Sequence, residues 1–519
     1  MADASATRGF LPDRRTASGQ VLWIIAAFSL LRLLEAAFIG LGTDESYTVA
    51  VSRELHLSYF DHPPIHYWIV HALSPMLGYG RASRLPFVAL FAGSTWLMFR
   101  LTRRLFGEAA GVWAALALNL TGFFAVAAGD WVLPDGPLIF FLLAAANALA
   151  DGWFGEAETP AHPFRTWLWA GLWIGLAALS KYQAALFCAG LGVFVLTDRA
   201  RRRDLLTPGP YAAAVLTVLI LSPVLIWNAQ NHWASFAFQG GRGVPNKGVH
   251  VDGPVVALLG QLALLLPWVF VPLAMAGVVA ARAGPADRRR WFCLMLAAPA
   301  IALFTLIPLV SPRTLPHWSM PGWLFLFPLL GLMLATAADA AKAWPRRWAV
   351  ASAAILVVVG GLAVTEAATG VLGAAFPKAF KKGDPTAESI DWTALRAQLD
   401  QEGLLKTPGV FVVSLKWNEA GKVDDAVGGE APVLVFSNDP RQFAYRVPSA
   451  SLIGHDAVIV APPKTLAAHR AELATYFQTL TPEPAVEVGR GGRKEVEVDV
   501  LLGHDLLKPY PLPGPPPAR

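Results

Sequence analysis

Long apolar runs, separated by short polar segments, follow one another along the chain from Val21 to Ala367. Runs long enough to span a bilayer, or slightly short of that length, lie at 21–41, 84–104, 109–128, 134–150, 166–180, 182–198, 210–227, 254–281, 291–310, 317–337 and 347–367. A transmembrane helix needs about 20 apolar residues to cross the hydrocarbon core. The pattern predicts a polytopic α-helical membrane protein with about eleven transmembrane helices, or about ten to thirteen if short runs merge or split.

Composition agrees with this pattern. Hydrophobic residues make up 55% of the 519 positions and charged residues only 15%, which excludes an ordinary soluble protein. Both cysteines, Cys188 and Cys293, lie inside apolar runs, which argues against a disulfide framework or a cysteine zinc site. The first run lacks an Ala-x-Ala cleavage site, so it is predicted to be an uncleaved span.

Basic residues predict the orientation. They precede the first run and follow the second, sixth, eighth and tenth, as Arg14, Arg15, Arg100, Arg103, Arg104, Arg199, Arg201, Arg202, Arg203, Arg282, Arg288, Arg289, Arg290, Lys342, Arg346 and Arg347. All fall on one side, which the positive-inside rule makes cytoplasmic. This predicts a cytoplasmic N-terminus at 1–20 and a transmembrane region at 21–375. Loops 42–83 and 228–253 are then on the opposite side.

The composition changes after Phe376. Short β-like runs begin at Val410, Val433 and Ala457, and the stretches 391–402 and 466–479 have the pattern of amphipathic helices. A small soluble α/β domain is therefore predicted at 376–507, on the same side as the two loops. The proline-rich tail at 508–519 is predicted to be extended.

Asp44 and Glu45 directly follow the first apolar run. Charged groups beside the hydrocarbon layer are costly and usually bind or react with something. Asp44 is a candidate general base for an attacking hydroxyl, with Glu45 as its supporting neighbour. The alternative is structural, as a helix-end cap or an ion-pair partner for Arg84.

The segment from Tyr59 to Trp68 is a second candidate. Pro63-Pro64 suits a helix start, with Asp61 as its cap. Asp61, His62 and His66 have a spacing that a divalent metal site could use, and His62 alone could face a phosphate. The alternative is an interfacial belt of aromatic and histidine side chains.

Further charges are expected on the same side. Asp135 follows the bend at Gly129–Pro134, where its alternative role is a helix-entry cap. Lys181, Arg242 and Arg84 suit the binding of a phosphate that must be held and then stabilised as it leaves, unless each pairs with a carboxylate. His317 is expected to be an interface residue.

These motifs occur in an order that resembles bacterial glycosyltransferase family 39. That family comprises protein mannosyltransferase-like enzymes with a GT-C fold, including the lipid A aminoarabinose transferase. The resemblance rests on Asp44-Glu45, Tyr59 to Trp68, Asp135 to Leu138, Gly175 to Tyr182, Leu315 to Trp323 and Asn438 to Phe443. It implies inverting transfer of a sugar from a polyprenyl-phosphate donor, at the periplasmic face of a bacterial inner membrane. The implied acceptor is a hydroxyl or phosphate, with lipid A, lipopolysaccharide or another glycolipid favoured.

The resemblance also implies roles for individual residues. Asp44 matches the family's presumed base and Asp135 its second acidic position. His62 stands where the aminoarabinose transferases carry a phosphate-contacting lysine, which would make phosphate binding pH dependent. Arg242 matches a phosphate-binding arginine, but Gln239 and two glycines replace the histidine expected just before it. No cofactor is implied with certainty, and a divalent metal stays open.

Two other functions fit the hydropathy pattern. One is sugar transfer to a protein acceptor, as in a protein O-mannosyltransferase, and the other is transport or flipping of lipid-linked sugars. Transporters often contain paired repeats with polar sites at mid-membrane. This chain has no obvious internal repeat and its polar residues gather at one face, which favours an enzyme.

Overall fold

The computed structural model describes residues 13–155, 162–242, 248–311, 314–381 and 383–511. The distal N-terminus at 1–12 and the end of the predicted tail at 512–519 lie outside the described residues. The helices of the first part are α1 (Ala17–Phe38), α2 (Thr43–Val51), α3 (Ile65–Leu77), η1 (Gly80–Arg84), α4 (Leu85–Phe106), α5 (Glu108–Asn119), α6 (Gly122–Ala125), α7 (Asp135–Trp153), α8 (Pro163–Ala178), α9 (Ala184–Thr197), η2 (Arg201–Leu206), α10 (Pro208–Gln230), α11 (Ala234–Gly241), α12 (Gly253–Leu265), α13 (Pro267–Ala283), η3 (Gly284–Ala286), α14 (Arg288–Leu306), η4 (Ile307–Leu309), η5 (Pro316–Ser319), α15 (Met320–Trp323), η6 (Leu324–Leu326), α16 (Phe327–Asp339), α17 (Trp344–Thr369) and α18 (Val371–Ala375).

Every apolar run predicted from the sequence is helical, which confirms the polytopic helical class. By length and composition, eight helical segments of the described chain can cross a membrane, and α9 and α12 are shorter apolar helices. The expected span at 254–281 is two helices, because the chain breaks at Leu266 (φ 71°) and Pro267 starts α13. The expected span at 109–128 is a twelve-residue α5 followed by the single turn of α6.

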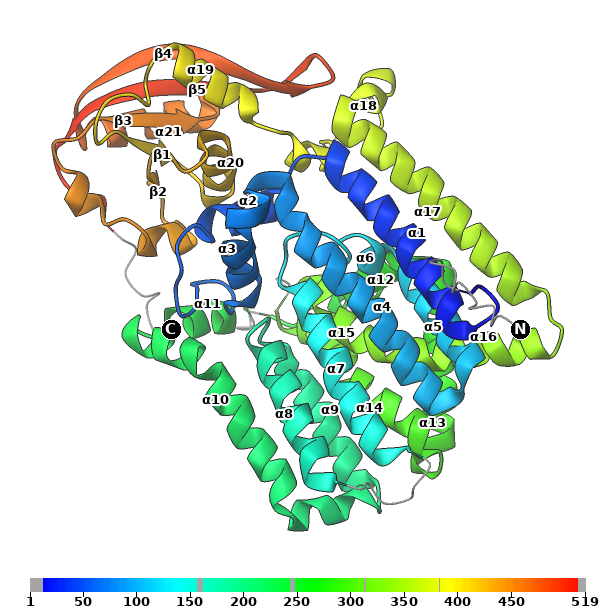
Figure 1. The fold of residues 1–519 in the computed structure, drawn as a ribbon. Helices are drawn as coiled ribbons and strands as arrows, with labels where there is room; N and C mark the ends of the chain where they lie inside the picture. The colour runs from blue at the N-terminus through cyan, green and yellow to red at the C-terminus, as the bar shows by residue number, and fades with distance from the viewer. Residues whose placement is uncertain (1–12, 156–161, 243–247, 312–313, 382, 512–519) are drawn as a thin grey trace, which may run out of the picture.

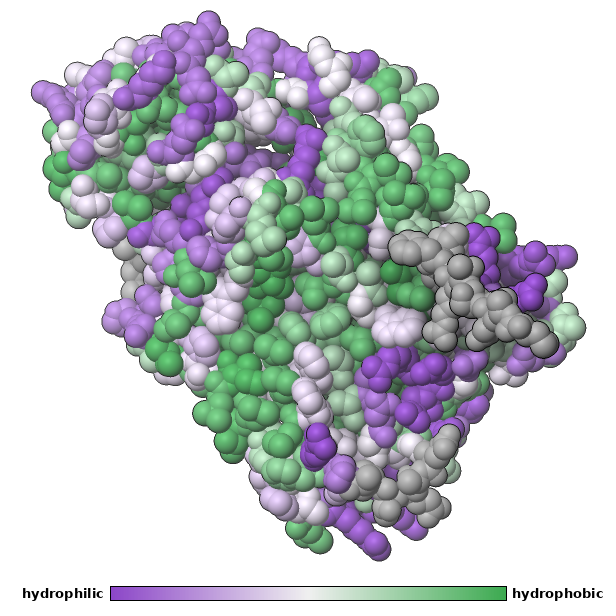
Figure 2. All heavy atoms as spheres, viewed as in Figure 1, coloured by the Kyte–Doolittle hydropathy of each residue, from purple (hydrophilic) through white to green (hydrophobic). Residues whose placement is uncertain are grey.

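The long helices differ in how much of them the protein itself covers. The most apolar stretch is 72% buried in α7 and 83% buried in Pro316–Asp339, but only 17% in α1 and 11% in α17. α1 and α17 run side by side along one flank of the bundle (Figure 1). Broad hydrophobic surface covers the helical part, whereas the C-terminal part is mainly hydrophilic (Figure 2). Helices such as α1 and α17 are therefore suited to face lipid.

The C-terminal part contains a five-stranded sheet with the order β2-β1-β3-β5-β4. Its elements are η7 (Pro385–Ser389), α19 (Thr393–Gln401), β1 (Phe411–Ser414), α20 (Trp417–Val427), β2 (Val433–Val435), η8 (Arg441–Tyr445), η9 (Ser449–Leu452), β3 (Ala457–Ala461), α21 (Pro463–Leu473), β4 (Phe477–Arg490) and β5 (Arg493–Leu506). β1 is parallel to β2 and β3, and β5 is antiparallel to β3 and β4. The three β-like runs of the sequence are confirmed as β1, β2 and β3.

The hairpin of β4 and β5 was not predicted. Pro482 and Pro484 interrupt the β4 pattern, and proline usually argues against a strand. The helix expected at 466–479 is therefore wrong at its end, because α21 stops at Leu473 and β4 begins at Phe477. The two-residue turn is Gly491-Gly492, both with positive φ, as the tight hairpin turns with a right-handed twist require.

The sheet domain packs directly onto the segment that carries Asp44. One face of the sheet forms a core with α19, α20 and Tyr47 of α2, and the other face packs on α21. Gly421 of α20 lies so close to α2 that an added Cβ would be 2.5 Å from the Tyr47 backbone nitrogen. Lys422 donates hydrogen bonds to the carbonyls of Leu41 and Ile390. The segment expected as a long loop at 42–83 is thus an ordered interface built from α2, α3 and η1.

Candidate active site

A cavity of about 690 Å³ lies where the helical bundle meets the C-terminal domain. Its ionisable lining side chains are Asp44, Tyr47, Asp61, His62, Tyr67, Asp135, Lys181, Arg242, His317 and Arg441. The structure therefore brings together six residues that sequence reasoning selected: Asp44, Asp61, His62, Asp135, Lys181 and Arg242. Glu45, His66 and Arg84 were also selected, but they do not line the cavity.

Asp44 and Glu45 have opposite surroundings because neighbouring residues of a helix point about 100° apart. Both lie in the first turn of α2. The exposed Asp44 side chain faces the cavity and makes no hydrogen bond to a described residue. Glu45 is only 1% exposed and accepts hydrogen bonds from the backbone N–H groups of Gly42 (2.8 Å) and Val132 (3.1 Å). Glu45 is a structural support and Asp44 is available to react.

The charge state of the two carboxylates differs accordingly. Desolvation in the recessed cavity raises the pKa of Asp44, and nearby Asp61 raises it further while Arg441 opposes the shift. Burial also raises the pKa of Glu45, but the Arg84 charge and four hydrogen bonds outweigh it and leave that pKa below its ordinary value. Asp44 is therefore the more basic of the two carboxylates.

Arg84, which the sequence suggested as a ligand of the donor phosphate, does not line the cavity and is paired with Glu45. Its guanidinium donates to Glu45 Oε1 at 2.7 Å and to the carbonyls of Ile39 and Gly40, each at 2.9 Å. The side chain is 2% exposed and, with a second bond to Glu45 Oε2, makes four hydrogen bonds to these partners. The structural alternative, an ion pair between Glu45 and Arg84 that closes the end of α1 onto α2, is the one the structure shows.

Asp135 and Lys181 form a buried ion pair on the cavity wall. Lys181 Nζ donates to both carboxylate oxygens, at 3.0 and 2.9 Å, and both side chains are less than a tenth exposed. Asp135 starts α7 without capping it. The pair couples α7 to the α8–α9 connection and places a compensated cation beside the cavity.

Asp61, His62 and His66 do not form the metal site considered from the sequence. Asp61 Oδ1 accepts hydrogen bonds from the hydroxyls of Tyr47 (3.1 Å) and Tyr67 (3.0 Å). The two imidazole ring centroids are 5.8 Å apart, and the His66 ring packs in a tilted arrangement against Tyr67. Within the described ranges no group of three or more His, Cys, Asp or Glu side chains could hold a metal ion. Asp61 also does not cap α3, because the tyrosines take its carboxylate.

His62 lines the cavity but is not a cation at neutral pH. Burial lowers the pKa of His62 well below its ordinary value, and the nearby Lys181 charge adds to this. A neutral imidazole can donate one hydrogen bond to a phosphate without supplying charge. The pH-dependent phosphate binding expected from the histidine substitution is therefore not favoured near pH 7.

Sequence reasoning missed Arg441 and Trp417, which the C-terminal domain contributes to the cavity. The Arg441 guanidinium carbon lies 3.5 Å from the Trp417 ring centroid, and its Nη1 is 3.5 Å from Asp61 Oδ2. The only signal in the sequence was the segment Asn438 to Phe443, to which no role was assigned. No local pattern indicates that a residue of the distal sheet domain reaches a membrane rim.

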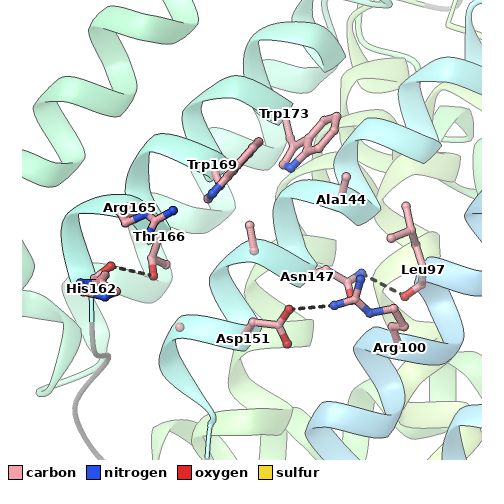
Figure 3. A pocket seen from close by; sticks show the side chains of 12 residues that line it. Leu97, Arg100, Ala144, Asn147, Asp151, His162, Arg165, Thr166, Trp169 and Trp173 are labelled. Carbon is pink, nitrogen blue, oxygen red and sulfur yellow. Dashed lines mark hydrogen bonds and ion pairs between the residues drawn. The ribbon is translucent and has the colours of Figure 1, made fainter.

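A second cavity, of about 560 Å³, lies at the other end of α7 (Figure 3). Trp169 and Trp173 project toward it from α8, and Arg100 and Asp151 face each other across α4 and α7. Asp151 accepts from Arg100 Nη2 at 3.1 Å and from Arg104 Nε at 3.0 Å. These charges pair with one another on neighbouring helices. Among its described lining residues, this cavity has no unpaired carboxylate comparable to Asp44.

Comparisons with known proteins agree with this arrangement. Residues 61–227, which include His62, Asp135 and Lys181, match the family model described as dolichyl-phosphate-mannose-protein mannosyltransferase. The chain is 24% identical over 322 residues to the lipid A galacturonosyltransferase RgtD of Rhizobium johnstonii. That match covers 58% of this chain and 63% of RgtD, so the chain spans less than two thirds of this relative.

Two solved structures resemble most of the chain. They are crystal structures of ArnT from Cupriavidus metallidurans, one in the apo state and one bound to undecaprenyl phosphate. Each has a TM-score of 0.60 and covers 93% of this chain and 98% of its own, at 18% and 17% identity respectively. At this identity the likeness shows the fold.

The chain is therefore a multi-pass membrane protein with the GT-C fold and a small C-terminal sheet domain. Its sequence is similar to the protein mannosyltransferase family over residues 61–227 and to a lipid A galacturonosyltransferase, in line with the resemblance that its motifs indicated.

Proposed function

We propose that this protein is a membrane glycosyltransferase that moves a sugar from a polyprenyl-phosphate donor to a lipid A-type glycolipid, with inversion at the sugar's anomeric carbon. The observation that carries the proposal is the state of Asp44. Among the carboxylates of this region, Glu45 is paired with Arg84, Asp135 with Lys181, and Asp61 with two tyrosines. Asp44 alone among these four faces the cavity without a hydrogen-bond partner in the described residues.

The proposed reaction is one displacement. Asp44 takes the proton from the acceptor hydroxyl while the acceptor oxygen attacks the anomeric carbon from the face opposite the phosphate. The bond between that carbon and the phosphate oxygen breaks, and its electron pair leaves with the polyprenyl phosphate. Lys181 and Arg242 stabilise the negative charge that develops on the leaving phosphate. His62 donates a hydrogen bond to the same group. A phosphate acceptor would attack without the proton transfer.

The membrane placement is also a proposal. The end of α7 that carries Asp151 lies near Arg100, Arg103, Arg104 and Arg289, a cluster typical of a cytoplasmic boundary. The Asp44 cavity and the domain at 376–507 would then face the periplasm of a bacterial inner membrane. A donor whose tail lies among apolar helices can reach this rim with its phosphate, and the site then needs no nucleotide.

Transfer by the purified protein in lipid nanodiscs tests the proposal. Synthetic undecaprenyl phosphate carrying labelled galacturonic acid or 4-amino-arabinose is the donor, and lipid A is the acceptor. We expect labelled lipid A and an equal amount of released undecaprenyl phosphate, without added metal. Movement of intact donor between the leaflets without transfer would instead identify a flippase. Label found on a serine-rich acceptor peptide but not on lipid A would favour the protein O-mannosyltransferase-type alternative.

A further inference from the structure

Arg441 enters the cavity because the C-terminal domain holds its backbone firmly. It starts the 3₁₀ helix η8 in the left-handed region (φ 50°), which is unfavourable for a residue with a side chain and persists only where neighbours impose it. The next residue supplies that constraint. Gln442 donates its backbone N–H to the Tyr47 hydroxyl at 3.1 Å and accepts from the Phe60 N–H at 2.8 Å. The domain thus aims Arg441 at the cavity from across its interface with α2.

The guanidinium of Arg441 still has donors to offer. Its plane is supported by Trp417, and its two carboxylate neighbours, Asp61 and Asp439, are 3.5 and 3.7 Å away, longer than an ordinary charge-assisted hydrogen bond. Its Nε is buried and makes no hydrogen bond within the described residues. A guanidinium carries five N–H donors in a planar fork, and a buried one is stable only when these donors find acceptors.

Arg242 and Arg441 both lie near the aromatic ring of Phe238. The guanidinium carbons of Arg242 and Arg441 are 5.4 and 5.5 Å from the Phe238 ring centroid, and Arg242 also lies 5.1 Å from Trp318. Burial lowers the pKa of Arg242, and the Arg441 charge is the next largest cause. Two like charges gathered in one recessed site favour an anion between them.

Lys181 and Arg84 already hold their carboxylate partners, Asp135 and Glu45, at hydrogen-bond distance, so Lys181 can offer the phosphate only part of its charge. We propose that Arg441 and Arg242 together bind the phosphate of the polyprenyl-phosphate donor, so that the C-terminal domain supplies part of the donor site. This inference rests on the proposed function. Two planar forks suit a phosphate, whose oxygens accept bidentate hydrogen bonds. This pair of arginines, the phosphate clamp, also binds more strongly as the departing phosphate takes up a second negative charge.

Binding of undecaprenyl phosphate, which carries no sugar, to the full-length protein in nanodiscs tests the clamp. Arg441→Gln should weaken binding about 10- to 100-fold, the range expected for lost hydrogen bonds to a charged group. The affinity of Arg441→Lys should fall between those of the wild type and Arg441→Gln, because lysine keeps the charge but lacks the planar fork of donors. Undecaprenol, which lacks the phosphate, should bind the wild type and Arg441→Gln equally.

Arg446→Gln is the matched control, because Arg446 lies at the end of the same 3₁₀ helix but pairs with Glu54 and Asp424 at the domain interface. It should lower thermal stability and leave the affinity of the folded fraction for undecaprenyl phosphate unchanged. Unchanged affinity in Arg441→Gln would overturn the inference. So would weakened binding confined to donors with an acidic sugar, since Arg441 would then read the sugar and not the phosphate.

The binding assay needs no turnover, so it separates the two proposals. Arg441-dependent binding in a protein that transfers no sugar would contradict the proposed function and leave the clamp standing. Transfer that is equally efficient in the wild type and in Arg441→Gln would do the reverse.

Discussion

Helix α7 carries an aspartate near each end, and the two have different fates. Asp135 and Asp151 lie about 24 Å apart along the helix axis, and each lines a cavity. Asp135 is 6% exposed and bound by a lysine from the α8–α9 connection, whereas Asp151 is 38% exposed and bound by arginines of the adjacent α4. Desolvation makes a buried charge lower the stability of the fold unless its partner is held in place, while an exposed ion pair contributes little to stability.

The same contrast extends to the whole cavities. The Asp44 cavity is built from segments far apart in the sequence, up to Trp417 and Arg441 of the sheet domain. The cavity at the other end of α7 is built from α4, α7, α8 and the residues just before α8. Convergence of distant segments is what an active site needs, because reacting groups must come from several directions. We therefore propose the first cavity as the site of the chemistry, and four predictions can break or sharpen that proposal.

Removal of the proposed base should have the largest effect. Asp44→Asn should lower the rate of transfer about 10²- to 10⁴-fold, the usual contribution of a general base. Stability should hardly change, because the Asp44 carboxylate makes no hydrogen bond to a described residue. Single-turnover transfer and thermal unfolding of the same preparation measure both effects. Full activity in Asp44→Asn would remove Asp44 as the base.

Breaking the buried ion pair should mainly affect stability. Lys181→Met leaves the Asp135 carboxylate buried and unpaired, which should cost about 3–5 kcal/mol of unfolding free energy. Adding Asp135→Asn should recover much of this loss, because the uncompensated charge is gone, while transfer stays impaired. The corresponding change at the other end, Arg104→Met, should cost about 0–1 kcal/mol. Equal costs at the two ends would erase the contrast.

The pH dependence of transfer should report the environment of Asp44. Only the ionised carboxylate can take a proton, so kcat/KM should fall as the pH drops through the pKa of Asp44, which desolvation in the recessed cavity raises. The acidic limb is expected above about pH 4, the ordinary aspartate value. Arg441 opposes this shift, so Arg441→Gln should move the limb to higher pH. His62→Gln should leave it in place, since His62 is not among the main charges that shift the pKa of Asp44.

The smallest effect is expected at the cavity of Figure 3. Asp151→Asn removes the carboxylate that Arg100 and Arg104 share, yet these side chains are 38–43% exposed and water can solvate them. We expect transfer within about twofold of the wild type and a stability change of about 0–1 kcal/mol. A loss of transfer comparable to that of Asp44→Asn would place chemistry or an essential coupling at this end.

Much of the fold could be predicted because its signals are local. Membrane-length hydropathy and short β-branched runs each depend on neighbouring residues, and they located the helices and the strands β1, β2 and β3. The misses have local causes too. Pro482 and Pro484 concealed β4, and the helix break at Leu266 left no mark beyond the proline that follows it. Asp44 as the base, and the periplasmic placement of the site, stay predictions.

The sequence by itself determined which residues could be reactive, by placing rare charges beside apolar spans. It did not determine which of them are free. Asp44 and Glu45 are adjacent and chemically alike, and only the position of Arg84 across the bundle makes one a structural ion pair and leaves the other facing the cavity. The sequence left open whether Lys181 binds a phosphate or a carboxylate, and the structure places Asp135 beside it. Arg441 became part of the site only when the sheet domain packed on α2. Hydropathy can be read from neighbouring residues along the chain, but charge pairing depends on residues that meet in space. Only the tertiary structure therefore decided which charges of this cavity are paired.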